Sequence, residues 1–521
     1  MSFRGKYLKI DDFSGGDCSA LAPTLLNPNQ ALGLDNIIIY PEGKGFRSRG
    51  LTAYSNSTEF GSADAFPVIG VGILEKSDGT NHVLAIKKGK AYGGLANDGR
   101  TTTYTDRTAA IVISTGTTGA ERAGYRWSFC THNDLLIGFG GPSTAPDAPF
   151  KWAGETNNIA ALGGTPPSAL FGFSENNRVF ACRTAANPSI FQWTVLGNPE
   201  DWTGTGSGSV TVGNLNDGEP LEAACVISRN LALLFKRNSI YQVDLTAAPF
   251  APQLLFKGVG AMGVNSVAVA DGVAYFLTPQ KQFMATDGNK IITIPPNSSK
   301  LSAMVIGTTP LVFRLRSRSG ASFQSPEFDM IVVCGLNSSA ATDGVVITAA
   351  WDMKNKCWLY FSTGYQFISG ATKQGTGYFY GGWSNQGRVF YPEFMHPFSG
   401  VLTTDDTGVS SGAINSYWQS GHLKGGLIDE YVRLIRAELD GGTYYSAATV
   451  TMTYGYDLGS LSKTASFAFN TSLDKAKASL NGKGGEVSFK IAFSASSDQG
   501  MIEIRSLTLG GRIPVGAKAA A

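Results

Sequence analysis

The stretch LEAACVISRNLALLFKRNSIYQVDLTAAPFAPQLLFKGVGAMGVNSVAVADGVAYFLTPQKQFMATDG, residues 221–288, decides the fold of this chain. Apolar runs of about five residues alternate in it with polar turn residues, the pattern of short strands joined by hairpins. The runs are Glu222–Ile227, Leu231–Phe235, Ser239–Val243, Ser266–Ala270, Val273–Leu277 and Gln282–Thr286. Short antiparallel strands in repeated meanders predict the blades of a β-propeller.

The same cycle recurs on both sides of this stretch, at a spacing of roughly 35–55 residues. The additional predicted strands are Phe66–Leu74, His82–Ile86, Lys90–Gly94, Arg126–Cys130, Leu135–Gly140, Pro149–Trp152, Leu170–Phe173, Arg178–Cys182, Ile190–Val195, Phe328–Cys334, Val345–Asp352, Trp358–Ser362, Tyr365–Ser369 (as the end of the sixth meander), Gly377–Trp383 and Arg388–Tyr391. These meanders predict about six blades, with one blade of latitude either way.

The two ends of the chain have a different pattern. Residues 1–60 predict an extended arm with one strand or hairpin, which includes Asn36–Tyr40 and is docked on another module. Residues 400–521 contain longer strands, in which Val450, Met452 and Tyr454 alternate with threonines, the period of a half-buried sheet. The predicted fold class is therefore all-β. A propeller spans 61–399, and a β-sandwich platform is built from 400–521 together with the arm.

Composition agrees with this organisation. A chain of 521 residues exceeds the ~250–300 residues at which a single core stops growing. Its 64 glycines suit many tight turns, and its formal net charge of +2 does not call for a polyanionic partner. No secretory signal and no apolar run of about 18 residues is visible, so we expect no membrane insertion. The six cysteines are expected to be free thiols of a protein made in a reducing cytoplasm.

Three stretches resemble the tail nozzle proteins of short-tailed bacteriophages, the tail tubular protein B type, and the related packaged-DNA stabilisation proteins. The first is N-terminal: Phe13-Ser14-Gly15-Gly16, Pro23, Ala31-Leu32, Asn36 and Arg47-x-Arg49-Gly50. The second is NNRVFACRTAANPSIFQWTVLGNPEDWTG, residues 176–204. The third combines NLALLFKRNSIYQVD with GAMGVNSVAVADGVAYFLTPQKQFMATDG, within residues 230–288.

This resemblance implies a structural virion protein that forms the distal tail tube, retains the packaged genome and provides the channel for DNA ejection. It implies a homo-oligomeric ring, commonly hexameric, below a head-to-tail connector, with tail fibres or tailspikes as further partners and double-stranded DNA in transient passage. The implied location is the tail of the virion, after assembly in the host cytoplasm. The family is not enzymatic in this module, so no catalytic residue, cofactor or metal ligand is carried over.

Two motifs favour a structural interpretation. Gly258-Val259-Gly260-Ala261-Met262-Gly263 spells a dinucleotide fingerprint, but Val264–Ala270 predicts another strand where that motif needs a helix N-terminus. A connection between two blades is the better interpretation of this glycine motif.

Cys130 and His132 would begin a metal site, yet no CxxC or HxxxH motif accompanies them. A turn histidine beside a core thiol is the simpler interpretation of this pair.

Two other functions remain open at this stage. One is a binding module whose propeller loops recognise a host surface or anchor fibres. The other is a glycan hydrolase, which needs two carboxylates roughly 5–9.5 Å apart in a groove. The candidate carboxylates are Asp329, Asp352, Glu393, Asp405 and Asp406. Sequence alone places no pair of them in a cleft.

The strongest charge feature is Phe313-Arg314-Leu315-Arg316-Ser317-Arg318. In a strand, Arg314, Arg316 and Arg318 share one face. They are the candidate contacts to the DNA channel, to phosphate or to an acidic neighbouring subunit. The competing interpretation is a solvated strand face that protects a sheet edge. Lys87, Lys88 and Lys90 lie on a predicted hairpin turn and are expected to be solvent exposed.

Overall fold

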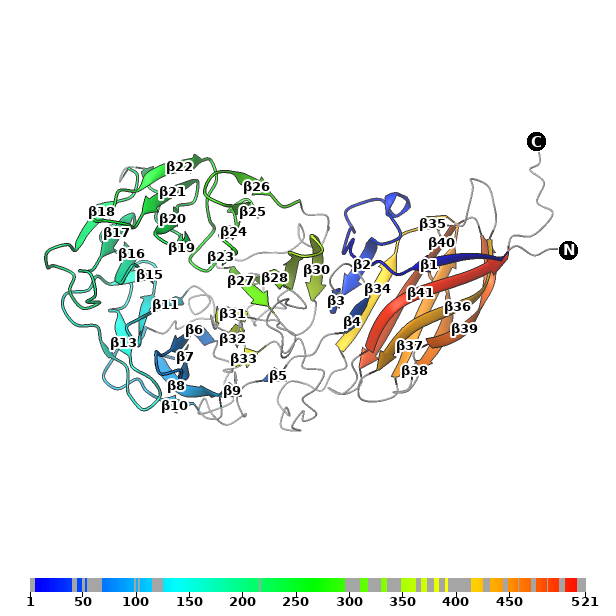
Figure 1. Cartoon of the computed structure of the whole chain (residues 1–521), viewed down its shortest axis with the longest axis horizontal. Helices are drawn as coiled ribbons and strands as arrows, with labels where there is room; N and C mark the ends of the chain where they lie inside the picture. The colour runs from blue at the N-terminus through cyan, green and yellow to red at the C-terminus, as the bar shows by residue number, and fades with distance from the viewer. Residues whose placement is uncertain are drawn as a thin grey trace.

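A computed structural model of the chain describes residues 5–39, 45–48, 52–53, 68–97, 100–101, 104–114, 125–214, 217–295, 310–316, 329–334, 348–361, 367–372, 379–383, 389–391, 414–424, 432–443, 448–457, 459–469, 475–484, 486–495 and 502–512. Within these residues the regular structure is β-strand, apart from the 3₁₀ turn η1, Pro23–Leu25. No helix in this part of the chain has the length and apolarity needed to cross a membrane. Figure 1 shows a ring of small sheets beside a domain of two longer sheets.

Seven of the sheets formed by the described residues are small antiparallel meanders, which we number as blades one to seven. Blades one to four contain β6 Val68–Glu75, β7 Asn81–Lys87, β8 Lys90–Asn97 (extended by β9 Arg100–Thr101) and β10 Thr105–Asp106; β11 Arg126–His132, β12 Leu135–Gly141, β13 Phe150–Trp152 and β14 Ala160–Ala161; β15 Ala169–Glu175, β16 Arg178–Thr184, β17 Ile190–Trp193 and β18 Gly208–Thr211; and β19 Ala223–Ser228, β20 Leu231–Phe235, β21 Ser239–Asp244 and β22 Gln253–Lys257.

Blades five to seven complete the series. They contain β23 Val267–Ala270, β24 Val273–Leu277, β25 Phe283–Thr286 and β26 Ile291–Thr293; β27 Leu311–Arg316, β28 Asp329–Cys334, β29 Thr348–Asp352 and β30 Cys357–Phe361; and β31 Phe367–Thr372, β32 Phe379–Trp383, β33 Val389–Tyr391 and β5 Thr52–Ala53.

The first strands of the blades form a closed circle. β6 contacts β11, and the contacts continue through β15, β19, β23, β27 and β31 back to β6 (Figure 1). At the closure, the hydroxyl of Ser369 in β31 donates a hydrogen bond to the carbonyl of Val68 in β6, at 2.6 Å. β5, from the N-terminal part of the chain, pairs with β33 and provides the outer strand of blade seven. The predicted β-propeller is therefore confirmed, and its seven blades lie within the predicted range of about six with one blade of latitude.

Two differences between the predicted and the observed strands account for the additional blade. Tyr365–Ser369 was expected to end the sixth meander, but β31, which begins at Phe367, is the first strand of blade seven. The first strand of blade six is β27, which pairs with β28 along its whole length. β5 lies more than 300 residues before its partner, and sequence spacing cannot indicate such a pairing.

The hairpin turns use residues that tolerate a left-handed backbone. Asn133 and Asp134 have φ of 46° and 58°, and Asn176 and Asn177 have φ of 49° and 55°. Two consecutive residues with positive φ make a turn whose twist matches that of the flanking strands, and Asn and Asp are favoured there. These turns set the strand register, which places alternate side chains of each strand in the apolar layers between blades.

The second domain is a sandwich of two six-stranded sheets. One sheet joins β3 Ile37–Ile39, β4 Phe46–Ser48, β41 Ile502–Arg512, β36 Val432–Thr443 and β39 Lys475–Gly484, with β1 Gly5–Ile10 on β41. The other joins β2 Ala31–Asp35, β34 Ile414–Ser420, β40 Glu486–Ala495, β37 Ala448–Tyr456 and β38 Lys463–Phe469, with β35 Leu423–Lys424 on β40. Val450, Met452 and Tyr454 are buried as their spacing predicts.

The N-terminal arm completes both sheets of this sandwich. Asn36 separates β2 from β3 and has φ of 54°, which lets the chain leave one sheet and enter the other within one residue. The end of the arm differs from the prediction, because β5 pairs with the propeller and not with the platform. The predicted boundaries at 60/61 and 399/400 lie outside the described residues.

The arm also joins the sandwich to blade six. The amide of Asp17 donates a hydrogen bond to the carbonyl of Trp358, at 3.0 Å, and the amide of Asn36 donates one to the carbonyl of Tyr360, at 2.9 Å. Both acceptors lie in β30, whose outer edge would otherwise be unpaired. A single apolar core runs from the sandwich through Ile37–Ile39 into blade six, where it includes Leu359 and Phe361. The two domains are therefore packed as one unit.

Candidate functional site

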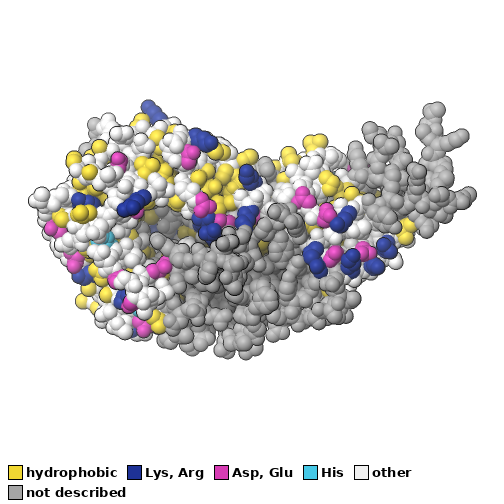
Figure 2. Space-filling model, viewed as in Figure 1, with side chains coloured by type: hydrophobic (Ala, Val, Ile, Leu, Met, Phe, Trp, Pro, Cys, Tyr) yellow, Lys and Arg dark blue, Asp and Glu magenta, His cyan; other side chains and the backbone are white. Residues whose placement is uncertain are grey.

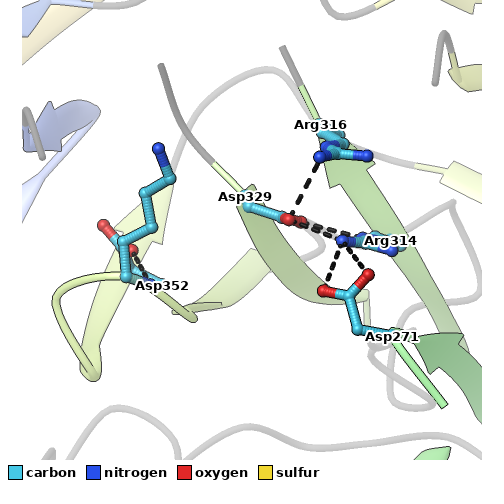
Figure 3. A network of polar contacts seen from close by, with 6 residues as sticks. Asp271, Arg314, Arg316, Asp329 and Asp352 are labelled. Carbon is cyan, nitrogen blue, oxygen red and sulfur yellow. Dashed lines mark hydrogen bonds and ion pairs between the residues drawn. The ribbon is translucent and has the colours of Figure 1, made fainter. Parts of the chain in front are cut away.

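The predicted arginine strand lies in the innermost position of blade six. β27 carries Arg314 and Arg316, while Arg318 lies outside the described residues. Asp329, the first residue of the neighbouring strand β28, is opposite Arg316 in the strand register. Both arginines reach this carboxylate from the same face of β27, as Figure 3 shows.

Arg314 is held by two carboxylates from different blades. Its Nε donates to Oδ1 of Asp329 at 2.9 Å, and its Nη2 donates to Oδ2 of Asp329 at 2.6 Å. The same Nη2 donates to Oδ1 and Oδ2 of Asp271 at 3.1 and 3.0 Å. Asp271 belongs to the hairpin turn of blade five, so this guanidinium connects blades five and six (Figure 3). Hydrogen bonding to Asp329 raises the pKa of Arg314.

Burial differs sharply among these groups. The side chain of Asp329 is 8% exposed and that of Arg314 is 18% exposed, whereas Asp271 is 75% exposed. A charge as buried as Asp329 requires a partner, and Arg314 provides two hydrogen bonds to it. Tyr275 of β24 lies beside the cluster, and its pKa is raised by burial and then by the charges of Asp271 and Asp329. The cluster therefore stabilises the contact between two blades.

Arg316 is the more available cation of the pair. Its Nε lies 3.7 Å from Oδ2 of Asp329, beyond hydrogen-bond distance, and makes no hydrogen bond among the described residues. Its side chain is 33% exposed. Of the predicted contact residues, Arg314 is engaged within the chain and Arg316 remains able to approach a partner. A role in contacting DNA or a neighbouring subunit stays a prediction.

The carboxylates considered for glycan cleavage have other contacts. Asp352 ends β29 and accepts hydrogen bonds from the amides of Lys354 and Asn355, at 2.9 and 3.0 Å, and from the Asn355 side chain at 2.8 Å. Burial raises the pKa of Asp352. Figure 3 shows the Asp329 and Asp352 carboxylates directed away from each other. Glu393, Asp405 and Asp406 lie outside the described residues.

The glycine motif at 258–263 lies between β22 of blade four and β23 of blade five. The amide of Gly258 donates to the carbonyl of Asn238, that of Ala261 to Lys236, and that of Met262 to Leu277. Its backbone is therefore used in contacts to the neighbouring hairpins. The motif is therefore a connection between two blades, as predicted.

Cys130 and His132 both lie on β11, where burial raises the pKa of Cys130 to about 12 and lowers the pKa of His132. Nδ1 of His132 lies 3.0 Å from the hydroxyl of Ser174 in blade three. Groups of three or more His, Cys, Asp or Glu side chains suited to a metal ion are not found where the structure is described. All six cysteines are free thiols, as predicted.

The lysine turn differs from its prediction. Lys88 and Lys90 are exposed, and Nζ of Lys90 contacts Asp106 at 2.6 Å. Lys87 instead is only 1% exposed. It is the last residue of β7 and follows Ile86, so alternation alone did not predict that both would be buried. In a propeller, both faces of a blade are covered by neighbouring blades.

Sequence reasoning missed Asp271 and Tyr275 as neighbours of Arg314. The Asp271-Gly272 pair lies between the predicted strands Ser266–Ala270 and Val273–Leu277, and it connects β23 to β24. Its contact with a side chain 43 residues further along depends on the placement of adjacent blades. Turn residues give no signal of that placement.

No known protein family and no curated protein matches this sequence. Among solved structures, the chain is similar to the WD40 β-propeller domain of Doa1, at 13% identity and a TM-score of 0.37, covering 66% of this chain and 97% of that one. It is similar to BamB from Moraxella catarrhalis at 11% identity and a TM-score of 0.36, covering 68% and 95%. It is also similar to the GH74 xyloglucanase from Xanthomonas campestris, at 11% identity and a TM-score of 0.37, covering 63% and 43%.

Proposed function

We propose that this chain is a structural protein of a short-tailed bacteriophage virion, the nozzle that forms the distal tail tube. In this role it retains the packaged genome and opens a channel through which double-stranded DNA enters the host. Its mechanism is steric: loops at the axis of a homo-oligomeric ring close the channel and retract on infection. The ring lies below the head-to-tail connector, and fibres or tailspikes attach to the tail around it.

The observation that carries this proposal is the packing of propeller and platform as one unit. The arm provides strands to both sheets of the sandwich, and its amides at Asp17 and Asn36 bond to the edge of blade six. One apolar core continues across the junction. A tube that withstands the pressure of packaged DNA needs domains that do not hinge apart, and a large apolar junction provides that property.

The proposed role involves no chemical step by this chain. Asp329 is neutralised by Arg314, and Asp352 caps a turn. Both carboxylates therefore have structural contacts that support a steric function. A general acid would instead need a carboxyl group facing a groove beside a second carboxylate.

Electron microscopy of the purified chain, alone and mixed with the connector encoded by a neighbouring reading frame, tests the proposal. We expect hollow rings that stack coaxially on the connector. A chain that stays monomeric in both samples and binds host-cell envelopes would instead establish the alternative, a receptor-binding or fibre-anchoring propeller. Release of reducing sugars from a host polysaccharide would establish the glycan-degrading alternative.

A further inference from the structure

One outer face of the sandwich carries a concentration of cations. Lys9 lies on β1, Arg436 on β36, Lys475 and Lys477 on β39, and Arg505 on β41. We call these five residues the basic face. Their side chains are between 45% and 59% exposed. Figure 2 shows dark-blue side chains in a row over the part of the sandwich where Figure 1 places β36, β39 and β41.

The strand register extends this concentration along the sheet. Lys9 and Lys477 lie in one row across the sheet, through Thr508 of β41 and Glu438 of β36.

The carboxylates on the basic face do not balance its cations. Glu438 is shared by three of them, with Arg436 at 3.6 Å, Lys475 at 3.8 Å and Lys477 at 3.7 Å. Asp440 lies 3.3 Å from Arg505, and Asp11 lies 2.6 Å from Lys9. Pairs at this exposure are weak and are readily exchanged for contacts with another molecule.

Complementary charge lies on the propeller. Asp78 and Asp134 belong to the first hairpin turns of blades one and two, Glu155 to the loop between β13 and β14, and Glu175 to the end of β15. We call these four residues the acidic turns. In an antiparallel meander, the turn after the first strand and the turn after the third strand lie on the same face. The cations Lys76 and Arg178 lie on the same turns, which leaves an excess of negative charge.

Hydroxyl groups hold two of these carboxylates in place. Asp78 accepts from the amide and hydroxyl of Thr80, and Asp134 accepts from the amide and hydroxyl of Ser77. These hydrogen bonds lower the pKa of both aspartates and orient them without neutralising their charge. The side chains therefore remain anionic and fixed at the surface.

We infer that the basic face of one copy binds the acidic turns of a second copy, which joins the chains head to tail. The two surfaces belong to opposite ends of the molecule, since blades two and three lie at the end of the ring away from the sandwich, with blade one next to them (Figure 1). A head-to-tail contact between different surfaces generates a closed ring or an open filament. This contact identifies the surfaces that would join the copies of the proposed ring. That the chains close into a ring rests on the proposed function.

Charge favours a second copy over DNA as the occupant. Glu438 and Asp440 lie in the middle of the basic face, where they would repel the phosphates of a duplex. The acidic turns of a second copy also contain Lys76 and Arg178. These two cations can pair with Glu438 and Asp440, which DNA cannot do. Binding of duplex DNA by the basic face is the competing result in the experiment that follows.

The test uses charge reversal in the full chain and mass photometry at low and high salt. We expect the wild-type chain to assemble at low salt and to dissociate as salt screens the contact. Lys475→Glu/Lys477→Glu and Glu155→Lys/Glu175→Lys should each raise the dissociation constant by at least about tenfold, because like charges would then face each other. Combining all four substitutions should restore assembly. Lys257→Glu/Lys281→Glu, which changes exposed lysines elsewhere, is the matched control and should assemble as wild type does.

Each result separates the inference from the proposed function. Rings that persist in both reversal variants would overturn the inference and leave the nozzle intact. Filaments without an axial channel that respond to the substitutions as expected would support the contact and contradict the nozzle. A wild-type chain that stays monomeric at low salt, a quadruple variant that fails to assemble, or a gel shift of duplex DNA abolished by Lys475→Glu/Lys477→Glu would overturn the inference. Unchanged circular dichroism shows that each variant is folded.

Discussion

The backbone amide of Asn36 donates a hydrogen bond to the carbonyl of Tyr360, and this bond joins a strand switch in the platform to the outer edge of a propeller blade. Asn36 is 1% exposed and has a left-handed backbone between β2 and β3. Tyr360 is the fourth residue of β30, a strand in which every residue is buried. The arm thus covers an edge that would otherwise be open to pairing with other chains.

Gly16 should be intolerant of a side chain, because it packs against β30. A Cβ at Gly16 would lie 2.5 Å from Cβ of Cys357 and 2.9 Å from the carbonyl of Trp358, with φ at +60°. Gly16→Ala should lower the free energy of unfolding by about 1–3 kcal/mol more than Gly79→Ala. Gly79 also has positive φ, but nothing lies within 4 Å of its Cβ position. Urea unfolding measures the difference, and equal losses would show that the arm is not packed tightly at this position.

Arg314→Gln should destabilise the contact between blades five and six. The substitution leaves the buried Asp329 without its strongest partner, and breaking a buried ion pair on one side costs about 3 kcal/mol. Lys90→Gln, which removes an ion pair between exposed side chains, should have a far smaller effect. Thermal unfolding compares the two variants. If the Arg314→Gln variant loses no more in melting temperature than the Lys90→Gln variant, the cluster contributes little to stability.

The propeller should lose stability as pH falls below neutrality. Burial lowers the pKa of His82 and of His132 below the ordinary value of 6.5. The unfolded chain therefore binds these protons at a higher pH than the folded chain does. The contribution of these two histidines to the free energy of unfolding is fully present above pH 6.5. It is lost progressively as the pH falls from 6.5 towards the pKa values of the folded chain. Melting temperatures between pH 8 and pH 5 measure this, and His132→Asn should reduce the slope. A melting temperature that rises on acidification would contradict the assignment.

The thiols should react slowly in the folded chain. Burial raises the pKa of Cys18 to about 11 and the pKa of Cys130 and Cys225 to about 12, so few thiolates are present near pH 8. A chromogenic disulfide reagent should label six thiols rapidly in denaturant and react with them slowly under native conditions. Rapid labelling of Cys130 in the native chain, located by peptide mass spectrometry, would show that blade two opens readily.

Much of the propeller could be predicted because its inner strands are short, apolar and bounded by turn residues. Leu231–Phe235 and Val273–Leu277 match β20 and β24 at both ends. The outer strands are harder to predict from the sequence, since neighbouring blades cover only part of their side chains. β22 and β26 expose Leu254 and Ile292 and carry no alternation that distinguishes them from loops. Their hydrogen bonds to the third strand of the blade decide their structure.

The platform shows a second limit of sequence reasoning. β37 follows the predicted alternation of Val450, Met452 and Tyr454 with threonines, because large apolar side chains on one face give a clear period of two. β39 is not among the predicted strands, because its inward positions include Ala476 and its outward positions include Lys475 and Lys477, so the apolar signal is weak. The same lysines form part of the basic face. Contacts between segments far apart in sequence, such as Arg314 with Asp271, required the structure.

Genome retention is the most direct measure of the proposed function. Phage particles assembled with and without this chain can be compared by the fraction of packaged DNA that resists added nuclease. The nozzle proposal predicts that particles lacking the chain lose their DNA to the nuclease, and that purified chain added back restores protection. Full protection without the chain, together with a loss of adsorption to host cells, would contradict it and favour a receptor-binding propeller.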